Sequence, residues 1–454
     1  MPFKRLFGRG SDEPSSPTPQ DVADERDEQQ APDEATDEAT EDSTDAPEVE
    51  LDADAVDREW CDRAAAVIPG GSSTGSKRPA ALYGPASGQG PGHFTSAQGC
   101  RVVTASGRSL LDCTMALGSV AIGYGDDAIN RAVLVAVAGG NCCGLASVAE
   151  VEVAERLCDM IPCAEQVRFF KAGGEAVAAA VRIARVATGR ATVIGCGYFG
   201  WLDWWNRGAG IPAGANADFV EVPFDDVAAL ERAAVAAGSG LAAIILEPVV
   251  HRLPSPEWCV VARRLCDDAG AVLIFDEMKT GFRLAPGGYQ EYAQVEPDLA
   301  VVGKAMANGF PIAAVVGRAA VMESANDTWI STTLAGEGVG LAATAAVLDI
   351  YAEMNVCETL WRVGGQMRES VAAAVSASGV PGVSVSGIDP MWSIDFDDPI
   401  RQQRFLERAA SEGVLFKRGA YNFAALAHDE DETLLEVERV ASTALVEVLE
   451  EEAS

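Results

Sequence analysis

The fold is decided by two short stretches, Val272-Leu-Ile-Phe-Asp276-Glu277 and Leu299-Ala-Val-Val-Gly-Lys304. Each is an apolar run of strand length that ends in charged residues. In doubly wound sheets, ligands bind outside the carboxyl ends of the strands. A carboxylate placed there can pair with a buried cation. The two stretches therefore predict a sheet with Asp276 and Lys304 at its ligand-binding edge.

Lys304 stands in a place that lysines usually avoid unless they are paired or reactive. Desolvation lowers the pKa of a lysine and makes its amine a nucleophile for carbonyl groups. Of the six lysines, only Lys304 follows an apolar strand and a glycine, whereas Lys279 lies on a predicted loop. Taken singly, Asp276 with Glu277 could be a helix cap or surface pair, and Lys304 could reach solvent. The 28-residue spacing of Asp276 and Lys304 favours a functional pair.

Strand-sized apolar runs alternate with helical stretches on both sides of these two stretches. Such alternation predicts an α/β fold with a mostly parallel sheet. After about residue 337 the chain mixes helices with an apolar alternation near Met391–Phe396, which predicts a smaller α+β domain. The predicted strands span 167–170, 192–196, 242–246 and 272–275, and the predicted helices span 58–67, 175–187, 227–237, 256–269 and 430–450.

Two further segments could contact a ligand. A predicted strand runs into Gly173-Gly174, which open a helix whose free amides and dipole suit a phosphate group. Tyr198 follows the predicted strand 192–196, where an aromatic ring can stack on a planar ligand. Each feature is weak alone, because glycine-opened helices are common and such aromatics more often pack in the core.

Composition excludes several classes of function. The 454 residues carry a net charge of −34, which repels nucleic acid and anionic membranes. No apolar run reaches the ~18–20 residues of a membrane span, and the N-terminus does not resemble a secretory signal. The 11 cysteines show no Cys-x-x-Cys spacing, and the three histidines have no neighbour at ligand spacing. We therefore expect no metal site, reduced thiols and a cytoplasmic location.

The chain divides into four predicted parts. Residues 1–54 are an acidic tail, too poor in apolar residues to fold, and we expect them to be dispensable for folding and activity. Residues 55–105 form an N-terminal segment that joins the small domain. Residues 106–336 form the large domain, and residues 337–454 form the C-terminal small α+β domain.

In this order, the segments resemble class III pyridoxal-phosphate aminotransferases, above all glutamate-1-semialdehyde 2,1-aminomutase and its relatives. The resemblance covers residues 56–452, and its most specific stretch is Leu273–Arg283 followed by Gly303-Lys304. It implies the type I aminotransferase fold, with a mostly parallel seven-stranded sheet in the large domain. It also implies pyridoxal 5'-phosphate as cofactor, a homodimer with sites at the interface, and a small-molecule amino donor and acceptor.

The resemblance assigns a role to each matching residue. Lys304 would form a Schiff base with the cofactor and move protons, and Asp276 would pair with the pyridinium nitrogen. The remaining cofactor-binding residues would be Gly173 and Gly174 at the phosphate, Tyr198 on the ring face, and Thr333 at the phosphate from the neighbouring subunit. Glu247, on the strand before Asp276, would help to position the site.

The departures from the family pattern fall in the substrate pocket. Ala172 replaces a serine whose hydroxyl would bind the phosphate. The loop after Pro69-Gly-Gly retains a basic residue for a substrate carboxylate, at Lys77 or Arg78. Arg252 replaces an asparagine and could either grip a carboxylate or form a salt bridge with the acidic surface.

Three functions follow from these observations. The first is an aminotransferase or aminomutase whose substrate the sequence does not name. The second is authentic glutamate-1-semialdehyde 2,1-aminomutase of tetrapyrrole biosynthesis, which needs no external amino donor. The third is a catalytically inactive binding or scaffold protein, and the retention of both Lys304 and Asp276 argues against it.

Overall fold

The computed structural model describes residues 52–85 and 90–453. The predicted acidic tail therefore lies outside the described residues, apart from 52–54. Helix α1 (Ala53–Val67) begins five residues earlier than predicted, and the Asp52 side chain caps it by accepting from the Asp54 amide. The boundary at residue 54 consequently falls inside a helix. The other domain boundaries stay predictions.

A seven-stranded sheet forms the centre of the larger α/β part. Its strand order is β4-β10-β9-β8-β7-β5-β6, and all strands run parallel except β10, which is antiparallel to both neighbours. The predicted mostly parallel sheet is confirmed. The strands are β4 (Gln166–Phe170), β5 (Thr192–Cys196), β6 (Phe219–Glu221), β7 (Leu241–Leu246), β8 (Val272–Asp276), β9 (Leu299–Gly303) and β10 (Ala313–Gly317).

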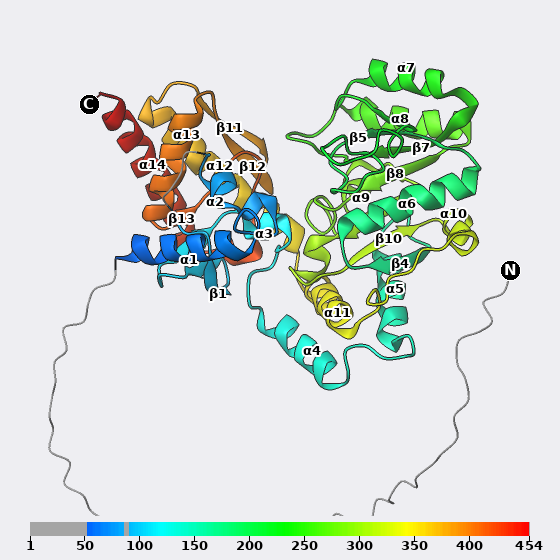
Figure 1. Ribbon diagram of the computed structural model, residues 1–454, viewed down its shortest axis with the longest axis horizontal. Coiled ribbons are helices and arrows are strands. Elements are labelled where there is room, and N and C mark those ends of the chain that lie inside the picture. The colour runs from blue at the N-terminus through cyan, green and yellow to red at the C-terminus, as the bar shows by residue number, and fades with distance from the viewer. Residues whose placement is uncertain (1–51, 86–89, 454) are drawn as a thin grey trace, which may run out of the picture. The chain divides into compact units, whose positions relative to one another are not determined.

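Helices cover both faces of this sheet (Figure 1). Alternate residues of the strands point to opposite faces, so every strand contributes to two apolar layers. Helix α6 (Gly173–Thr188) packs on one layer through residues such as Val177 and Ile183. On the other face lie α8 (Pro256–Ala269) through Trp258, and α5 (Val148–Met160), α7 (Val227–Ala237) and α11 (Gly338–Glu353).

Two smaller sheets accompany the central one, and the N-terminal and C-terminal segments meet in the first of them. Strand β13 (Val414–Leu415) pairs parallel with β3 (Ser109–Asp112) in a sheet of order β1-β2-β3-β13. The second has the order β11-β12-β14. The remaining elements are α2 (Pro79–Leu82), α3 (Met115–Gly118), α4 (Asp127–Ala138), α9 (Tyr289–Ala293), α10 (Ala319–Met322), α12 (Val356–Ser378), α13 (Pro399–Ser411), α14 (Asp431–Ala453), β1 (Phe94–Gln98), β2 (Arg101–Thr104), β11 (Val383–Ile388), β12 (Met391–Phe396) and β14 (Asn422–Phe423).

No single helix among the described residues is long and apolar enough to cross a membrane. One bent pair, α11 with α12, passes the same test of length and composition when its two helices are taken together. Both helices bury many of their side chains within the fold.

Arg283 joins three distant segments. Its fully buried guanidinium donates to the carbonyl oxygens of Ala424 at 2.8 Å and Gly118 at 3.0 Å. Gly118 ends a turn in which Met115, Ala116 and Leu117 all have positive φ, a conformation that costs roughly 1–2 kcal/mol per residue. Arg283 thus holds a strained turn against the C-terminal segment.

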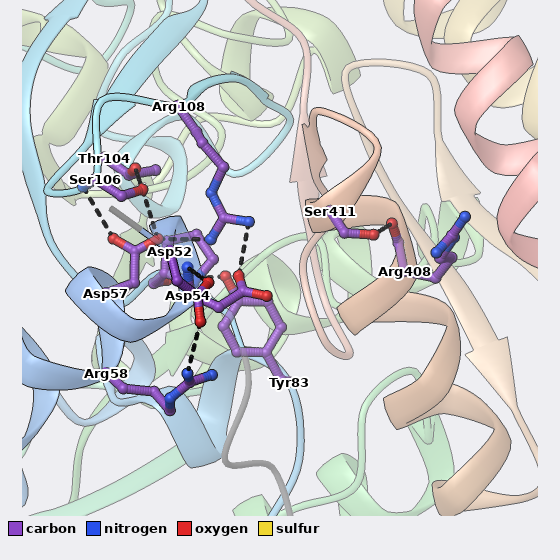
Figure 2. A network of polar contacts seen from close by, with 11 residues as sticks. Asp52, Asp54, Asp57, Arg58, Tyr83, Thr104, Ser106, Arg108, Arg408 and Ser411 are labelled. Atoms are coloured by element: carbon purple, nitrogen blue, oxygen red, sulfur yellow. Dashed lines mark hydrogen bonds and ion pairs between the residues drawn. The ribbon is translucent and has the colours of Figure 1, made fainter. Parts of the chain in front are cut away.

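A polar network attaches α1 to the β2–β3 turn (Figure 2). Asp57 is almost fully buried and accepts from Ser106 and from Arg108, the latter at 2.6 Å. Arg108 also pairs with the more exposed Asp54 at 2.9 Å. The first turn of α1 is therefore part of the folded body.

Truncation after residue 54 is expected to destabilise the fold. It removes the N-cap Asp52 and the partner Asp54, and loss of a cap costs about 1 kcal/mol. Truncation after residue 50 keeps both side chains and should retain the free energy of unfolding of the whole chain. Urea unfolding of the two truncated proteins measures the difference, and equal stabilities would contradict it.

Candidate active site

The carboxyl ends of β5, β7, β8 and β9 and the start of α6 surround a cavity of about 650 Å³. Parallel strands place these ends on one edge of the sheet. Six of the residues singled out from the sequence line this cavity: Gly173, Gly174, Tyr198, Glu247, Asp276 and Lys304. The structure thus brings together segments that are separated by up to 131 positions in the chain.

Asp276 ends β8 and is buried at the base of the cavity. Its Oδ1 accepts from the Met278 amide at 3.0 Å. Burial raises the pKa of this carboxyl, and the nearby Glu247 raises it further. Glu277 serves another purpose, because its carboxylate accepts from the amides of Tyr289 and Gln290 and fixes the following loop. Only the first of the two acids is available to a ligand.

Lys304 follows β9 and lines the same cavity. Its φ is +52°, a left-handed conformation that is uncommon outside glycine and is often found at functional sites. Burial lowers the pKa of its amine, and the charge of Lys279 lowers it further. Among the described residues, no ion pair joins Lys304 to a carboxylate. Both effects favour the uncharged, nucleophilic form of the amine.

Lys279 also lines the cavity, although the sequence placed it only on a loop. Its Nζ forms an ion pair with Glu247 Oε1 at 2.5 Å and donates to Tyr421 Oη at 3.2 Å. The sequence could have indicated that Lys279 lies at the cavity, because it follows Asp276 by only three residues. A short loop cannot carry a side chain far from the strand end. Tyr421 comes from the C-terminal segment and carried no comparable sign in the sequence.

Helix α6 presents to the cavity an N-terminus whose N-cap side chain forms no hydrogen bond, while Glu175 in its first turn accepts from the Lys171 and Ala172 amides. The first N–H groups of a helix have no acceptor within the helix, and those of Gly173 and Gly174 are among them. The N-cap residue, Ala172, has no side-chain oxygen to supply. Gly200 has φ +84°, and a Cβ there would lie 2.8 Å from the Cα of Gly174. This close approach and the free amides make a site for an anion.

Four of the predicted site residues do not reach this cavity within one chain. Thr333 lines a separate hollow of about 860 Å³, and Lys77 lines a third cavity of about 200 Å³. The Arg78 guanidinium donates to backbone carbonyl oxygens of its own loop. Arg252 pairs with Asp225 at 2.6 Å, which matches the salt-bridge interpretation of this arginine.

All 11 cysteines are free thiols, and burial raises the pKa of those in the core, such as Cys113. In the described parts of the chain, no group of three or more histidine, cysteine or acidic side chains gathers as it would around a metal ion. The titratable groups that line the cavity of Lys304 are lysine, tyrosine, histidine, cysteine and carboxylate side chains.

Ala172→Asp is expected to stabilise the protein and to weaken anion binding. An N-cap carboxylate contributes about 1 kcal/mol to helix stability, and its charge repels an anion at the same amides. Affinity for inorganic phosphate, measured by thermal-shift titration, should fall roughly tenfold. Ala172→Asn supplies a cap without charge and should lose less affinity. Unchanged phosphate affinity in Ala172→Asp would exclude α6 as the anion site.

The chain matches the family model for class III aminotransferases over residues 83–200 and 214–427. It is 33% identical to 2'-deamino-2'-hydroxyneamine transaminase of Streptomyces kanamyceticus, over 77% of this chain and 91% of that protein. It is also 33% identical to 3-aminobutyryl-CoA aminotransferase of Cloacimonas acidaminovorans, over 73% of this chain and 81% of that protein.

Solved structures agree with this match. The FumI protein of Sphingopyxis sp. MTA144, in its pyridoxal-phosphate internal aldimine form, superimposes with a TM-score of 0.83 and 28% identity. The superposition covers 88% of this chain and 98% of FumI. The type I aminotransferase fold expected from the sequence is therefore confirmed, and the two named relatives are transaminases rather than glutamate-1-semialdehyde 2,1-aminomutases. This chain belongs to the class III aminotransferases, and it is an enzyme that uses pyridoxal phosphate.

Proposed function

We propose that this enzyme transfers an amino group between small molecules, with Lys304 as the lysine that bonds to the cofactor aldehyde and Asp276 as the partner of its ring nitrogen. The observation that carries the proposal is their presence in one cavity with the start of α6. The three features match the three parts of pyridoxal phosphate that need a protein partner: aldehyde, ring nitrogen and phosphate.

The residues present fit this cofactor. The amides of Gly173 and Gly174 lack intrahelical acceptors and would hold the phosphate, without the hydroxyl that Ala172 cannot supply. Asp276 is a buried acid without an ion-pair partner among the described residues, and a protonated ring nitrogen would supply one. Tyr198, at the carboxyl end of β5 and 65% exposed in this chain, would lie against the ring face.

Pyridoxal phosphate, when bound, supplies an aldehyde for the amino group and a ring that accepts electrons from the substrate carbon. Lys304 would supply the amine that bonds to the cofactor aldehyde and would move a proton at the substrate's α-carbon. Asp276 would keep a proton on the ring nitrogen through its charge. Glu247 accepts from the Tyr198 amide at 3.2 Å and so fixes the segment that carries that ring.

The named relatives do not point to one substrate for this enzyme. The relatives named above act, by their names, on an amino-sugar compound and on a coenzyme A ester, so they share a reaction rather than a substrate. The aminomutase alternative has less support, because Lys77 and Arg78 do not line the cavity of Lys304. A substrate role of Arg252 stays a prediction, since its guanidinium is engaged by Asp225. A requirement for an external amino donor would separate aminotransferase from aminomutase.

Lys304→Ala is expected to fold, to bind the cofactor without a covalent bond, and to lose nearly all amino transfer. Borohydride reduction of the parent enzyme, followed by peptide mapping, should place the pyridoxyl label on Lys304. Lys279→Ala is the matched comparison, because Lys279 lines the same cavity but should leave the label where it is. A label on Lys279 or any other lysine in the parent enzyme would overturn the assignment.

A second copy of this chain is proposed to cover the segments around Thr333. Thr333 lines the 860 Å³ hollow together with residues from α4 and the loop that follows it. Large apolar side chains are exposed on these bordering segments, which is unusual for a surface that faces only water. They are Leu134, Val135, Val137, Leu145, Val148, Val151, Trp329 and Leu334. A homodimer would bury them and could bring Thr333 to the partner's cofactor phosphate.

Val135→Glu is expected to convert the dimer into monomer, because it places a charge in the apolar interface. Sedimentation velocity measures the mass of the species. Val235→Glu is the control, since Val235 is a comparably exposed valine on α7, away from the hollow. A dimeric Val135→Glu protein would exclude this face.

Thr333→Ala should weaken cofactor retention more than it lowers the melting temperature.

We propose a cytoplasmic location for this enzyme. The proposal is supported by the 11 cysteines, all of which are free in the structure. Free thiols persist in reducing compartments, whereas oxidising compartments convert paired cysteines to disulfides.

A further inference from the structure

The cavity holds a second lysine that the family resemblance did not assign. Lys279 forms the ion pair with Glu247 and donates to Tyr421, and its ammonium lies 4.4 Å from the centre of the Tyr421 ring. The side chains of Lys279 and Glu247 are only 13% and 10% exposed. Tyr421 is itself fixed, because its Oη accepts from the His251 amide at 2.9 Å. Lys279 is thus held at one point of the cavity wall.

The two lysines differ in their partners. Lys279 has a carboxylate at 2.5 Å, whereas no ion pair joins Lys304 to a carboxylate in the described parts of the chain. Two ammonium groups in one enclosed space repel each other, and the unpaired one loses its proton more easily. The charged and titratable side chains that face Lys304 across this cavity or act on it through space are Lys279, Asp276, Glu247, Arg283, Cys196, Tyr198, Glu221, His251 and Tyr421.

We infer that Lys279 is a positioning residue whose fixed positive charge, held in the same cavity, favours the uncharged and nucleophilic form of the Lys304 amine. The ion pair with Glu247 and the contact with Tyr421 hold that charge in place. Lys279 also neutralises Glu247, which would otherwise oppose ionisation of Asp276. The inference deepens the proposed function, because it rests on the role given to Lys304.

The pKa values of the two lysines are shifted in opposite directions from the ordinary value of a lysine. Burial alone would lower the pKa of Lys279, but Glu247 and Tyr421 outweigh it, and the pKa lies above the ordinary value. The pKa of Lys304 is lowered, first by burial and then by Lys279. As pH rises, Lys304 therefore gives up its proton first, while Lys279 stays charged. The cavity then contains one fixed cation and one free amine.

The test is the pH titration of the bound cofactor's absorbance, which reports protonation of the Lys304 nitrogen. In Lys279→Met the repulsion is gone and Glu247 is unpaired, so the titration midpoint should rise by roughly one pH unit or more. Lys279→Arg keeps the charge and should titrate near the parent. The double variant Lys279→Met with Glu247→Gln leaves no unpaired buried charge, which protects folding, and its midpoint should rise by less.

A second readout does not need a loaded enzyme. Acetic anhydride labelling of Lys304 in the cofactor-stripped full-length chain, mapped by mass spectrometry, should show the same rise in midpoint. Below the midpoint, Lys304 in Lys279→Met should be labelled more slowly than in the parent, roughly tenfold if the midpoint rises by one pH unit. Lys171→Met is the matched control: Lys171 is also partly buried beside a carboxylate, Glu337, but it does not line this cavity. Its midpoint should equal that of the parent.

Two results would overturn the inference. The first is an unchanged titration midpoint in Lys279→Met. Lys279 would then have a structural role or would bind a substrate carboxylate, because neither of these roles changes the midpoint of the substrate-free enzyme. Equal changes of midpoint in Lys279→Met and Lys279→Arg would show that shape, not charge, matters at this position. Borohydride mapping remains independent: a label on Lys304 upholds its role even if both readouts exclude Lys279.

Discussion

The parallel pairing of β8 with β9 is the contact on which the site depends. Asp276 lies opposite Val301 in this register, and the Glu277 amide donates to the Val301 carbonyl at 2.9 Å. The chain leaves β8 at Asp276 and leaves β9 at Lys304, so the acid and the amine emerge on the same edge. A slip of one residue in either strand would turn the side chains to the opposite face.

The electrostatic surroundings of Asp276 and Lys304 then set the protonation behaviour of their side chains. Burial penalises the charged form of both groups, and this penalty raises the pKa of Asp276 and lowers that of Lys304. Lys279 and Glu247 add a fixed ion pair beside them. The start of α6 contributes the positive end of a helix dipole, with the amides of Gly173 and Gly174 free and Glu175 accepting from the Lys171 and Ala172 amides. The site is thus prepared for a ligand that brings a phosphate and an ionisable ring.

Much of this could be predicted from sequence because the relevant features are local. A short apolar run between breaks favours a buried strand, and Val272–Asp276 and Leu299–Gly303 each begin with four apolar residues and form such strands. The antiparallel direction of β10 could not be predicted, since a run of apolar residues does not distinguish a parallel from an antiparallel strand. The start of α1 was placed too late because the tail and the helix are both rich in Asp and Glu.

By itself, the sequence determined the fold class and predicted the lysine, the acid and the glycine turn that line one cavity, because each is a short pattern with a direct physical meaning. Tertiary structure alone decided which side chains share the cavity. Tyr421 reaches Lys279 across 142 positions, and Arg252 is drawn to Asp225 rather than into the cavity. Such contacts depend on how strand ends and the C-terminal segment pack together. A loop lysine three residues beyond Asp276 becomes a buried cation only when that packing encloses it.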